Sequence, residues 1–197
     1  MQLDVAKFKP RNQSPRGDAE LVVNEQHFSR IVLNGICRAE VSLDIMTADL
    51  KAMLVPDGVS RHARSIVAVL RSLAQKGVEV RLLHAGVPSA PALAEMKRAL
   101  KKPALSRGLT IRRCPRLHAK AIIIDARRMY LGSANMTGAG LGAKADARRN
   151  FELGIWTESA PLIDPVLEQF NTLWEGRLCD GCCRRDVCPV PLEEPSL

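Results

Sequence analysis

The chain has 197 residues, enough for one domain that buries about 70% of the surface of its unfolded chain. Hydrophobic residues make up 46% and charged residues 25% of the sequence, and no apolar run approaches the roughly 18 residues that a membrane helix requires. This composition excludes a membrane-spanning protein and predicts a soluble, globular one.

The net charge of +8 is concentrated in one part of the chain. Between Lys97 and Arg149, fourteen Lys and Arg residues stand against two acids, Asp125 and Asp146. A positive field of this strength attracts partners that carry phosphate and speeds their arrival. The charge distribution therefore places the expected binding surface within residues 97–149.

The first elements follow a polar start. Residues 1–18 contain Pro and Gly and no apolar segment of a secretory signal, so we expect a flexible N-terminal segment and a cytoplasmic protein with mostly reduced thiols. Apolar spacings of three and four predict a helix over residues 19–39, and alternation predicts a strand over 40–50. An amphipathic helix over 61–77 ends at Gly77, and a strand over 78–86 follows at once.

The second half continues in the same pattern. We expect a short basic helix over residues 91–102, a strand over 108–114 and a third strand over 118–125, whose "AIII" run is typical of the middle of a sheet covered on both faces. Further strands are predicted over 127–135 and 150–157, a Gly-rich loop over 137–149, and a closing helix over 161–176. This alternation indicates a layered α/β domain, and the sequence contains no internal repeat.

His118 and Lys120 are the first candidate catalytic pair. Residues two apart in a strand face the same side, so the two side chains would point at one spot. An ammonium group beside an imidazole is unfavourable when buried unless an anion joins them, and a phosphate group would supply that anion. Ser133 and Asn135, after Gly132, add a hydroxyl and an amide suited to phosphoryl oxygens. The pattern predicts attack of a neutral imidazole on phosphorus.

The full spacing is His118-x-Lys120-x4-Asp125-x6-Gly132-Ser133-x-Asn135. It resembles the HKD motif of the phospholipase D superfamily. The segment 149–156, "RNFELGIW", is similar to the Asn-x-Glu strand of that family, in which the position of Glu152 holds a carboxylate that orients the catalytic histidine. The segments 66–83 and 170–174 are also similar, so the resemblance covers roughly residues 19–176, which we expect to be the catalytic domain.

This resemblance implies a mixed β-sheet sandwiched between helices and a covalent mechanism. His118 would be the nucleophile that forms a phosphohistidine, or the acid that protonates the leaving oxygen. Lys120, Ser133 and Asn135 would hold the phosphate, and Asp125 would fix the motif by hydrogen bonds. Glu152 would set the tautomer of the imidazole. Members of the family need no metal for this step, so no cofactor is expected in catalysis.

The single motif has a consequence for assembly. Family enzymes of double length carry two HKD motifs, whereas this sequence has one. A reaction with a nucleophile and a general acid on opposite sides of phosphorus then needs a second chain. We therefore expect a twofold homodimer with both copies of His118 at the shared interface.

The basic segment favours a nuclease that cleaves DNA or RNA, as short members of the family often are. We expect contacts with the phosphate backbone, for which arginine is well suited, and few base-stacking platforms, because only 4% of the residues are aromatic. The candidate contacts are Arg107, Arg112, Arg113, Arg116, Arg127, Arg128, Arg148 and Arg149.

Two other functions stay open. A phospholipase or phosphatidyltransferase would need an apolar entrance or an amphipathic surface helix, for which residues 91–102 are the candidate. A protein that binds nucleic acid without turnover is the third possibility. We expect no stable association with a membrane.

A cysteine-rich tail, residues 177–197, follows the last predicted helix. Cys179, Cys182, Cys183 and Cys188 fall within ten residues, and thiolates beside arginine are natural ligands of soft cations. The spacing Cys179-x2-Cys182-x5-Cys188 resembles the three-cysteine end of iron–sulfur nucleases of the RecB type, in which a distant cysteine completes the cluster. Here Cys114 or Cys37 would complete it. The alternatives are one structural zinc held by the four clustered thiols, and disulfides or free thiols.

Overall fold

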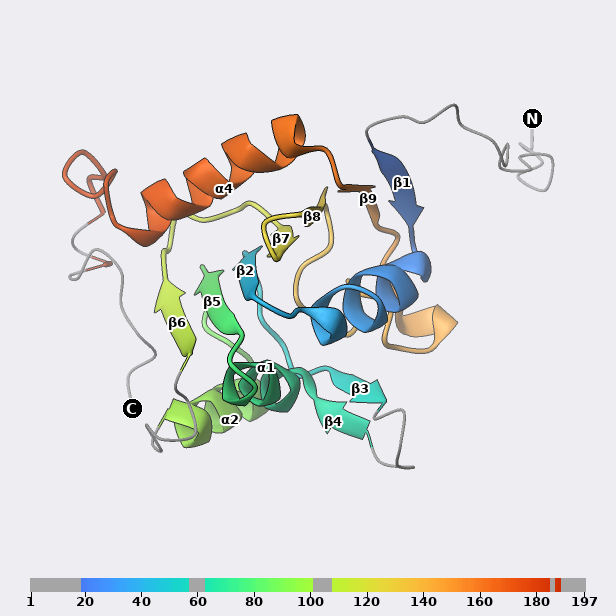
Figure 1. The fold of residues 1–197 in the computed structure, drawn as a ribbon. Coiled ribbons are helices and arrows are strands. Elements are labelled where there is room, and N and C mark those ends of the chain that lie inside the picture. Colours follow the sequence, from blue (N-terminus) through green and yellow to red (C-terminus); the bar gives the residue numbers. More distant parts are fainter. Residues whose placement is uncertain (1–18, 57–62, 101–107, 185–186, 189–197) are drawn as a thin grey trace, which may run out of the picture.

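The computed structural model describes residues 19–56, 63–100, 108–184 and 187–188 (Figure 1). The expected flexible segment 1–18 and Arg107 lie outside these residues, and the tail is described only in part. The central sheet has seven strands in the order β1-β9-β8-β7-β2-β5-β6. The strands are β1 (Glu20–Val23), β2 (Ser42–Thr47), β5 (Glu79–His84), β6 (Leu109–Arg113), β7 (Ala121–Ile124), β8 (Arg128–Gly132) and β9 (Leu153–Thr157).

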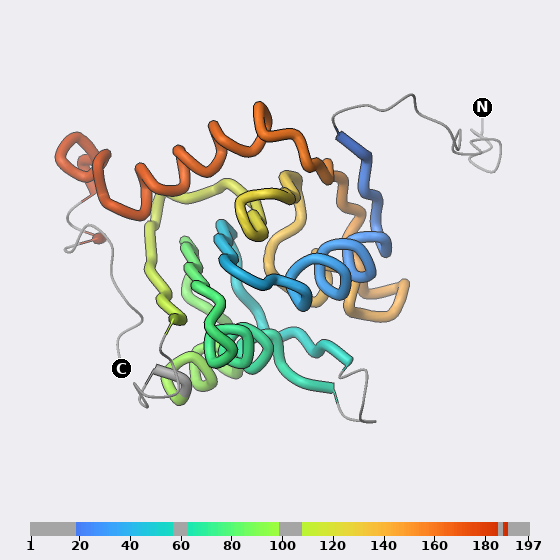
Figure 2. Tube along the Cα trace, in the orientation of Figure 1, coloured from blue at the N-terminus to red at the C-terminus, as the bar shows by residue number. Residues whose placement is uncertain are grey.

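The sheet is mixed. Strands β2, β5 and β6 are parallel, whereas β2 with β7, β7 with β8, β8 with β9 and β9 with β1 are antiparallel. A separate two-stranded sheet pairs β3 (Leu54–Pro56) with β4 (Ala63–Ser65). The tube in Figure 2 shows that the first and the last strand of the chain are neighbours, because β1 (blue) lies beside β9 (orange).

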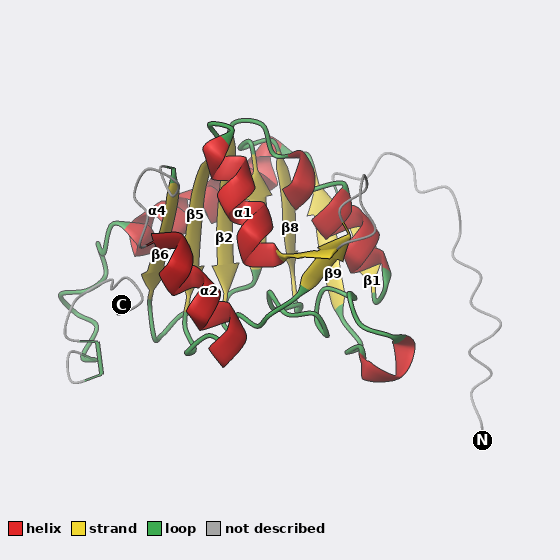
Figure 3. Cartoon of the chain, turned by 90° about the horizontal axis from the view of Figure 1, so that it is seen from below, coloured by secondary structure: helices red, strands yellow, loops and turns green. Residues whose placement is uncertain are grey.

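Helices cover both faces of the sheet, as Figures 1 and 3 show. On one face lie α1 (Ile66–Gln75), α2 (Ala90–Leu100) and the short helices η2 (Phe28–Leu33) and η3 (Ile36–Arg38). The opposite face is packed against α4 (Ala160–Trp174). The predicted α/β architecture, a mixed sheet between helices, is confirmed.

Helix α1 forms where the sequence predicts it. The hydroxyl of Ser65 accepts a hydrogen bond from the amide of Ala68 at 3.0 Å and so satisfies one of the unpaired amides at the helix start. The apolar face of the helix is buried in the main core. Gly77, at φ +100°, reverses the chain after the helix, a conformation that costs glycine little. Strand β5 then enters the sheet directly.

Strand β7 is the centre of the fold. All four of its residues are buried, and they alternate between the two faces. Ile122 and Ile124 pack into the main core, whereas Ala121 and Ile123 belong to the two clusters beneath α4. The "AIII" run therefore occupies a strand covered on both faces, as predicted.

Two predicted elements were wrong in part. Residues 19–39 do not form one helix, because residues 20–23 pair with β9 as an edge strand and Asn24, at φ +48°, turns the chain before the helical residues begin. Apolar spacing alone does not distinguish a short edge strand from the first turn of a helix.

The third strand is shorter than predicted. Strand β7 begins at Ala121, so His118 and Lys120 lie in the connection that precedes it.

None of the described helices is both long and apolar enough to cross a membrane.

Candidate active site

Five of the six predicted catalytic residues lie at one edge of the sheet. Strand β7 begins here, and Ala121, its first residue, pairs with Met46 near the end of β2 and with Leu131 near the end of β8. Strand β9 also begins at this edge, where Leu153 follows directly after Glu152. The register therefore brings to one edge the connections, far apart in the sequence, that carry His118, Lys120, Ser133, Asn135 and Glu152.

His118 and Lys120 contact each other. The Nζ atom of Lys120 lies 3.1 Å from Nε2 of His118 and donates to the carbonyl oxygen of His118 at 2.8 Å. An ammonium group can only donate hydrogen bonds, so Nε2 is the acceptor and carries a lone pair. The imidazole is exposed. Nε2 is the imidazole nitrogen that would attack phosphorus in the expected reaction.

Glu152 is fixed from several sides although it is only 8% exposed. Its carboxylate accepts hydrogen bonds from the hydroxyl of Ser133 and from Nδ2 of Asn150, the latter at 3.0 Å. Its backbone is held by Asn24, because the Glu152 amide donates to Asn24 Oδ1 at 3.1 Å and the Asn24 amide donates to the Glu152 carbonyl at 3.0 Å. A buried charge of this kind needs such partners.

The orientation of His118 by Glu152 stays a prediction. Within the described residues of this single chain, the Glu152 carboxylate makes no hydrogen bond to His118. Its partners are Ser133 and Asn150 instead.

Asn135 is held by its carbonyl oxygen. Its Oδ1 accepts from the amides of Ala48 at 3.1 Å and Asp49 at 3.0 Å, and from the hydroxyl of Thr47 at 3.3 Å. The Thr47 hydroxyl also accepts from the amide of Met136 at 2.9 Å. With Oδ1 committed, the Nδ2 group is the part of Asn135 that can donate to a phosphoryl oxygen.

A buried His27–Tyr130 pair supports the loop that carries Ser133 and Asn135. The Nδ1 atom of His27 donates to the carbonyl oxygen of Asn24 at 2.8 Å, so Nε2 accepts from the Tyr130 hydroxyl at 3.0 Å. That hydroxyl in turn accepts from the amide of Ala134 at 3.1 Å. Burial lowers the pKa of His27 and raises the pKa of Tyr130 to about 12. Both groups therefore stay neutral near pH 7.

The sequence did not reveal this support. His27 and Tyr130 lie 103 positions apart, and each occupies a place in an apolar pattern that predicts core packing. Both are indeed fully buried. A histidine inside such a pattern needs a hydrogen-bond partner, but only the fold identifies which residue supplies it.

Asp125 lies at the opposite end of β7 from His118. One of its carboxylate oxygens accepts from the amides of Val41 at 2.7 Å, Ser42 at 3.0 Å and Glu40 at 3.0 Å, and Arg128 lies 3.4 Å from the other. Burial alone would raise the pKa of Asp125, but these amides and Arg128 together lower it. The residue fixes the chain that enters β2, which agrees with a supporting role.

Four of the predicted arginine contacts lie in the connections at the catalytic edge. Arg113 ends β6 and donates to the carbonyl of Ala85 at 3.1 Å, and Arg116 is exposed two residues before His118. Arg148 and Arg149 belong to the connection between β8 and β9, both ends of which meet this edge; Arg148 is exposed and Arg149 pairs with Asp146.

The other described arginines are placed elsewhere. The Arg112 guanidinium stacks over Trp174 at 4.6 Å and donates to the Trp174 carbonyl at 2.7 Å, so it joins β6 to the end of α4. Arg127 and Arg128 lie at the turn after Asp125, at the far edge of the sheet. Arg127 and Arg128 are separated from His118 by the length of β7, whereas the Arg112 side chain is engaged by Trp174.

One described aromatic side chain lies outside the core. Phe151 is 96% exposed and directly precedes Glu152. Its position beside the catalytic edge makes it available to a substrate or to a second chain.

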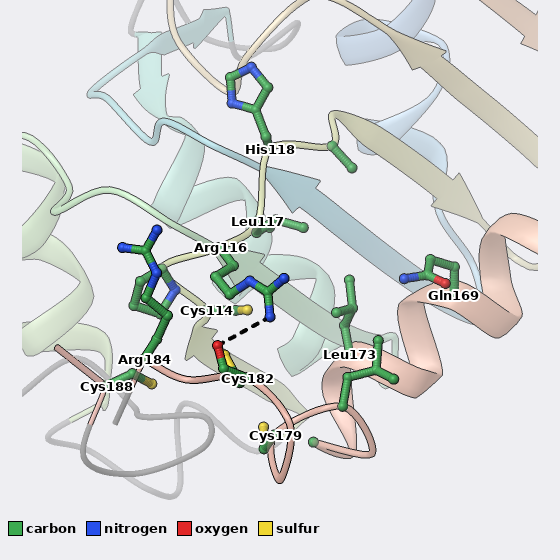
Figure 4. A pocket seen from close by; sticks show the side chains of 14 residues that line it. Cys114, Arg116, Leu117, His118, Gln169, Leu173, Cys179, Cys182, Arg184 and Cys188 are labelled. Carbon is green, nitrogen blue, oxygen red and sulfur yellow. Dashed lines mark hydrogen bonds between the residues drawn. The ribbon is translucent and has the colours of Figure 1, made fainter. Parts of the chain in front are cut away.

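A cavity of about 330 Å³ adjoins His118, between the β6–β7 connection and the tail (Figure 4). Its lining includes four of the six cysteines of the chain: Cys114, Cys179, Cys182 and Cys188. Cys183 is exposed and is not among the lining residues. Within the described part of the chain, no three His, Cys, Asp or Glu side chains are grouped to hold a metal ion. The zinc, the iron–sulfur cluster and the disulfides or free thiols of the tail all stay predictions.

Comparisons with known proteins show the family and the fold. Residues 32–174 match the family described as "Cardiolipin synthase, PLD-like domain". The chain belongs to this family. The fold of the PLD-like domain is similar to that of Nuc from Salmonella typhimurium, a phospholipase D family member (20% identity, TM-score 0.55), and to that of NucT from Helicobacter pylori (16% identity, TM-score 0.58).

Each of these two similarities covers 80% of this chain and 95% of the solved chain. No curated protein sequence matches the chain. Membership of the PLD-like domain family supports a phosphodiesterase-type enzyme at the level of the superfamily.

Proposed function

We propose that the protein is a nuclease that cleaves phosphodiester bonds of DNA or RNA through a phosphohistidine on His118. The observation that carries the proposal is the contact between Lys120 and Nε2 of an exposed His118, at the same edge as Ser133 and Asn135. These residues supply a nucleophile, a cation and polar donors around one place where a phosphate group fits.

The first half of the reaction uses the lone pair of His118. A bound phosphate displaces the Lys120 ammonium from Nε2, and the lysine then neutralises the phosphoryl oxygens together with Asn135. Nε2 attacks phosphorus and the bond to the leaving oxygen breaks. The leaving oxygen takes a proton from an acid on the other side of the phosphorus. In the second half, water attacks the phosphohistidine, gives its proton to that group and regenerates the free imidazole.

A second copy of the chain supplies the acid in this proposal. The sequence contains one HKD motif, and the described edge offers one exposed imidazole. A twofold dimer would bring a second His118 to the opposite side of the phosphate. The two histidines would exchange roles, one as nucleophile and the other as acid.

The position of the charge favours a nucleic acid over a lipid. Arg113 ends β6 at the catalytic edge, and the connections that meet this edge contain Arg116 and Arg148. Such positive charges suit a backbone of successive phosphates. Helix α2, the candidate lipid-binding helix, buries Ala92 and Met96 inside the protein and packs against α1. Its apolar side is therefore occupied, and this argues against an insertion into lipid.

The test compares the wild type with His118→Ala on labelled single- and double-stranded DNA, RNA and phosphatidylcholine vesicles, all in EDTA. Cleavage of nucleic acid by the wild type should fall by about a thousandfold or more in the variant. Arg127→Ala serves as a matched control because Arg127 is exposed at the far edge. Binding should weaken steeply as salt rises, and more so for the wild type than for Arg148→Ala.

Cleavage of the lipid alone would contradict the nucleic acid substrate. Tight binding of nucleic acid without turnover, equal in wild type and His118→Ala, would indicate a binding protein. Circular dichroism in EDTA shows whether the protein stays folded.

A further inference from the structure

Phe151 presents an aromatic ring to solvent beside the candidate active site. The side chain is 96% exposed, more than any other large hydrophobic side chain that the structure describes. Single exposed apolar side chains are common on protein surfaces, so exposure alone indicates no function. The position of the ring does, because Phe151 directly precedes Glu152, whose carboxylate accepts a hydrogen bond from the Ser133 hydroxyl.

The backbone on both sides of Phe151 is fixed. On one side the amide of Asn150 donates to the carbonyl of Ala139 at 3.1 Å, and the Nδ2 group of Asn150 donates to the Glu152 carboxylate at 3.0 Å. On the other side the amide and the carbonyl of Glu152 both bond to Asn24, at 3.1 and 3.0 Å. The ring is therefore held in place without being packed. A binding surface that is ordered in advance loses little conformational entropy when a ligand arrives.

The ring lies close to the place where the phosphate would react. Consecutive Cα atoms are about 3.8 Å apart, so Phe151 is that near to the residue that bonds Ser133. In the proposed reaction Ser133 stands beside the phosphate. Neighbouring nucleotides of one strand are separated by about 3.4 Å or more. A base that stacks on Phe151 would then belong to a nucleotide about one or two positions from the scissile bond.

The charges around the ring favour a nucleic acid over a protein partner. The connection between β8 and β9 carries Lys144 and Arg148, both exposed, and its exposed acid Asp146 pairs with Arg149. The centres of protein interfaces are depleted in charged residues. Sites for single-stranded nucleic acid instead combine positive charge with aromatic rings on which bases stack.

We propose that Phe151 stacks on an unpaired nucleobase next to the scissile phosphate, so that the substrate is single-stranded DNA or RNA. In a duplex each base is already paired and stacked between its neighbours, and a ring fixed on the protein surface finds no free base face there. The inference rests on the proposed nuclease function and adds the strand form of its substrate.

The experiment measures the binding of single-stranded and duplex oligonucleotides of one sequence, in the His118→Ala background that prevents turnover. Phe151→Ala should weaken binding of the single strand about tenfold, because one stacked base is lost, and should leave duplex binding nearly unchanged. Phe151→Trp should keep the affinity. A fluorescent purine analogue in the single strand should be quenched on binding, and less so by Phe151→Ala. Val41→Ala is the matched control, because Val41 is 68% exposed and lies beside Asp125, at the opposite end of β7.

Other results would overturn the inference. An equal loss of affinity for both strand forms, no loss for either, or a wild type that prefers the duplex would each contradict stacking. A halved mass of Phe151→Ala in light scattering would assign the ring to a contact between two chains instead. Because binding is measured without turnover, an absence of cleavage leaves this test unaffected. An absence of all binding to nucleic acid would contradict the proposed function itself, and the inference with it.

Discussion

Asp125 shows how a residue of the catalytic motif can act at a distance from the chemistry. Its carboxylate is occupied by three backbone amides at the start of β2 and lies at the opposite end of β7 from His118. The motif spacing groups it with the catalytic residues, but the strand between them separates the two by its full length. Its role is to hold the chain that leads into the site.

Asp125→Asn should therefore reduce stability rather than catalysis. Loss of the charge weakens the hydrogen bonds from the amides, and we expect a loss of about 2 kcal/mol at pH 7. Because the pKa of Asp125 is lower in the folded protein, its contribution is present above about pH 4 and disappears as the pH falls through the folded pKa.

Urea unfolding at several pH values measures this effect. The two proteins should differ at pH 7 and converge toward pH 2. A variant with normal stability and no activity would contradict the supporting role of Asp125.

His27 gives a second prediction of how stability depends on pH, and here the change falls near neutral pH. Burial lowers its pKa in the folded protein, so the unfolded chain binds more protons below the ordinary pKa of about 6.5. Stability should fall as the pH decreases from 7 to 5. In His27→Gln, part of this slope should be absent, and the lost bond to Tyr130 should cost about 1 kcal/mol at pH 7.

Thermal unfolding of the wild type and His27→Gln across this range is the measurement. If the unfolding temperatures of the two proteins changed equally with pH, His27 would not titrate as described. His118→Ala is the matched control, because that histidine is exposed.

Strands β8 and β9 approach closely at the site because two glycines face each other. Gly132 pairs with Gly154, and a Cβ atom on Gly132 would lie 2.6 Å from the Cα of Gly154. The ring of Tyr130 covers Gly154 closely enough that a Cβ there would collide with it. Because Gly132 and Gly154 carry no Cβ atom, the ring of Tyr130 has room and its hydroxyl reaches the Ala134 amide.

Gly154→Ala should destabilise the protein by about 2 kcal/mol, because the new methyl group meets the Tyr130 ring in a packed core. It should also lower the rate of cleavage, since Tyr130 supports the loop that carries Ser133. Gly181→Ala is the matched control because no atom lies within 4 Å of the added methyl group. Urea unfolding and steady-state kinetics provide the readouts, and a stable, fully active Gly154→Ala would disprove this packing argument.

Most elements could be predicted from their apolar pattern, because α1, β5 and α4 bury one side more than the other and β7 is a continuous apolar run buried on both faces. Strand β1 could not, since its four residues become a strand only by pairing with β9. The residues of the candidate site also divide into those that a local sequence pattern marks and those that only the fold brings together. Spacing marks His118, Lys120, Ser133 and Asn135 as candidates, and the fold places them at one edge, whereas the contact of His27 with Tyr130 is recorded by no local pattern.

At the scale of the whole molecule, the proposed dimer makes a quantitative prediction. If each active site needs two copies of His118, a mixed dimer of wild type and His118→Ala is inactive. After refolding mixed subunits together, the activity should follow the square of the wild-type fraction. Light scattering should show twice the mass of the chain at micromolar concentration.

A linear dependence on the wild-type fraction, or a monomer with full activity, would contradict this arrangement. Mixing the wild type with Arg127→Ala in the same way is the control, because Arg127 lies at the far edge and all dimers should remain active.

The union of β1 with β9 also determines when the site can be completed during folding. Asn24 holds the backbone of Glu152 from 128 positions away in the sequence, and Leu21 and Val23 lie opposite Ile155 and Leu153. Pairing across so long a stretch of chain is a slow step. His118 and Lys120 are near neighbours in the sequence, whereas the backbone of Glu152 is anchored only after β1 has paired with β9. A chain that starts after Asn24 would keep its nucleophile and lose the anchor of Glu152.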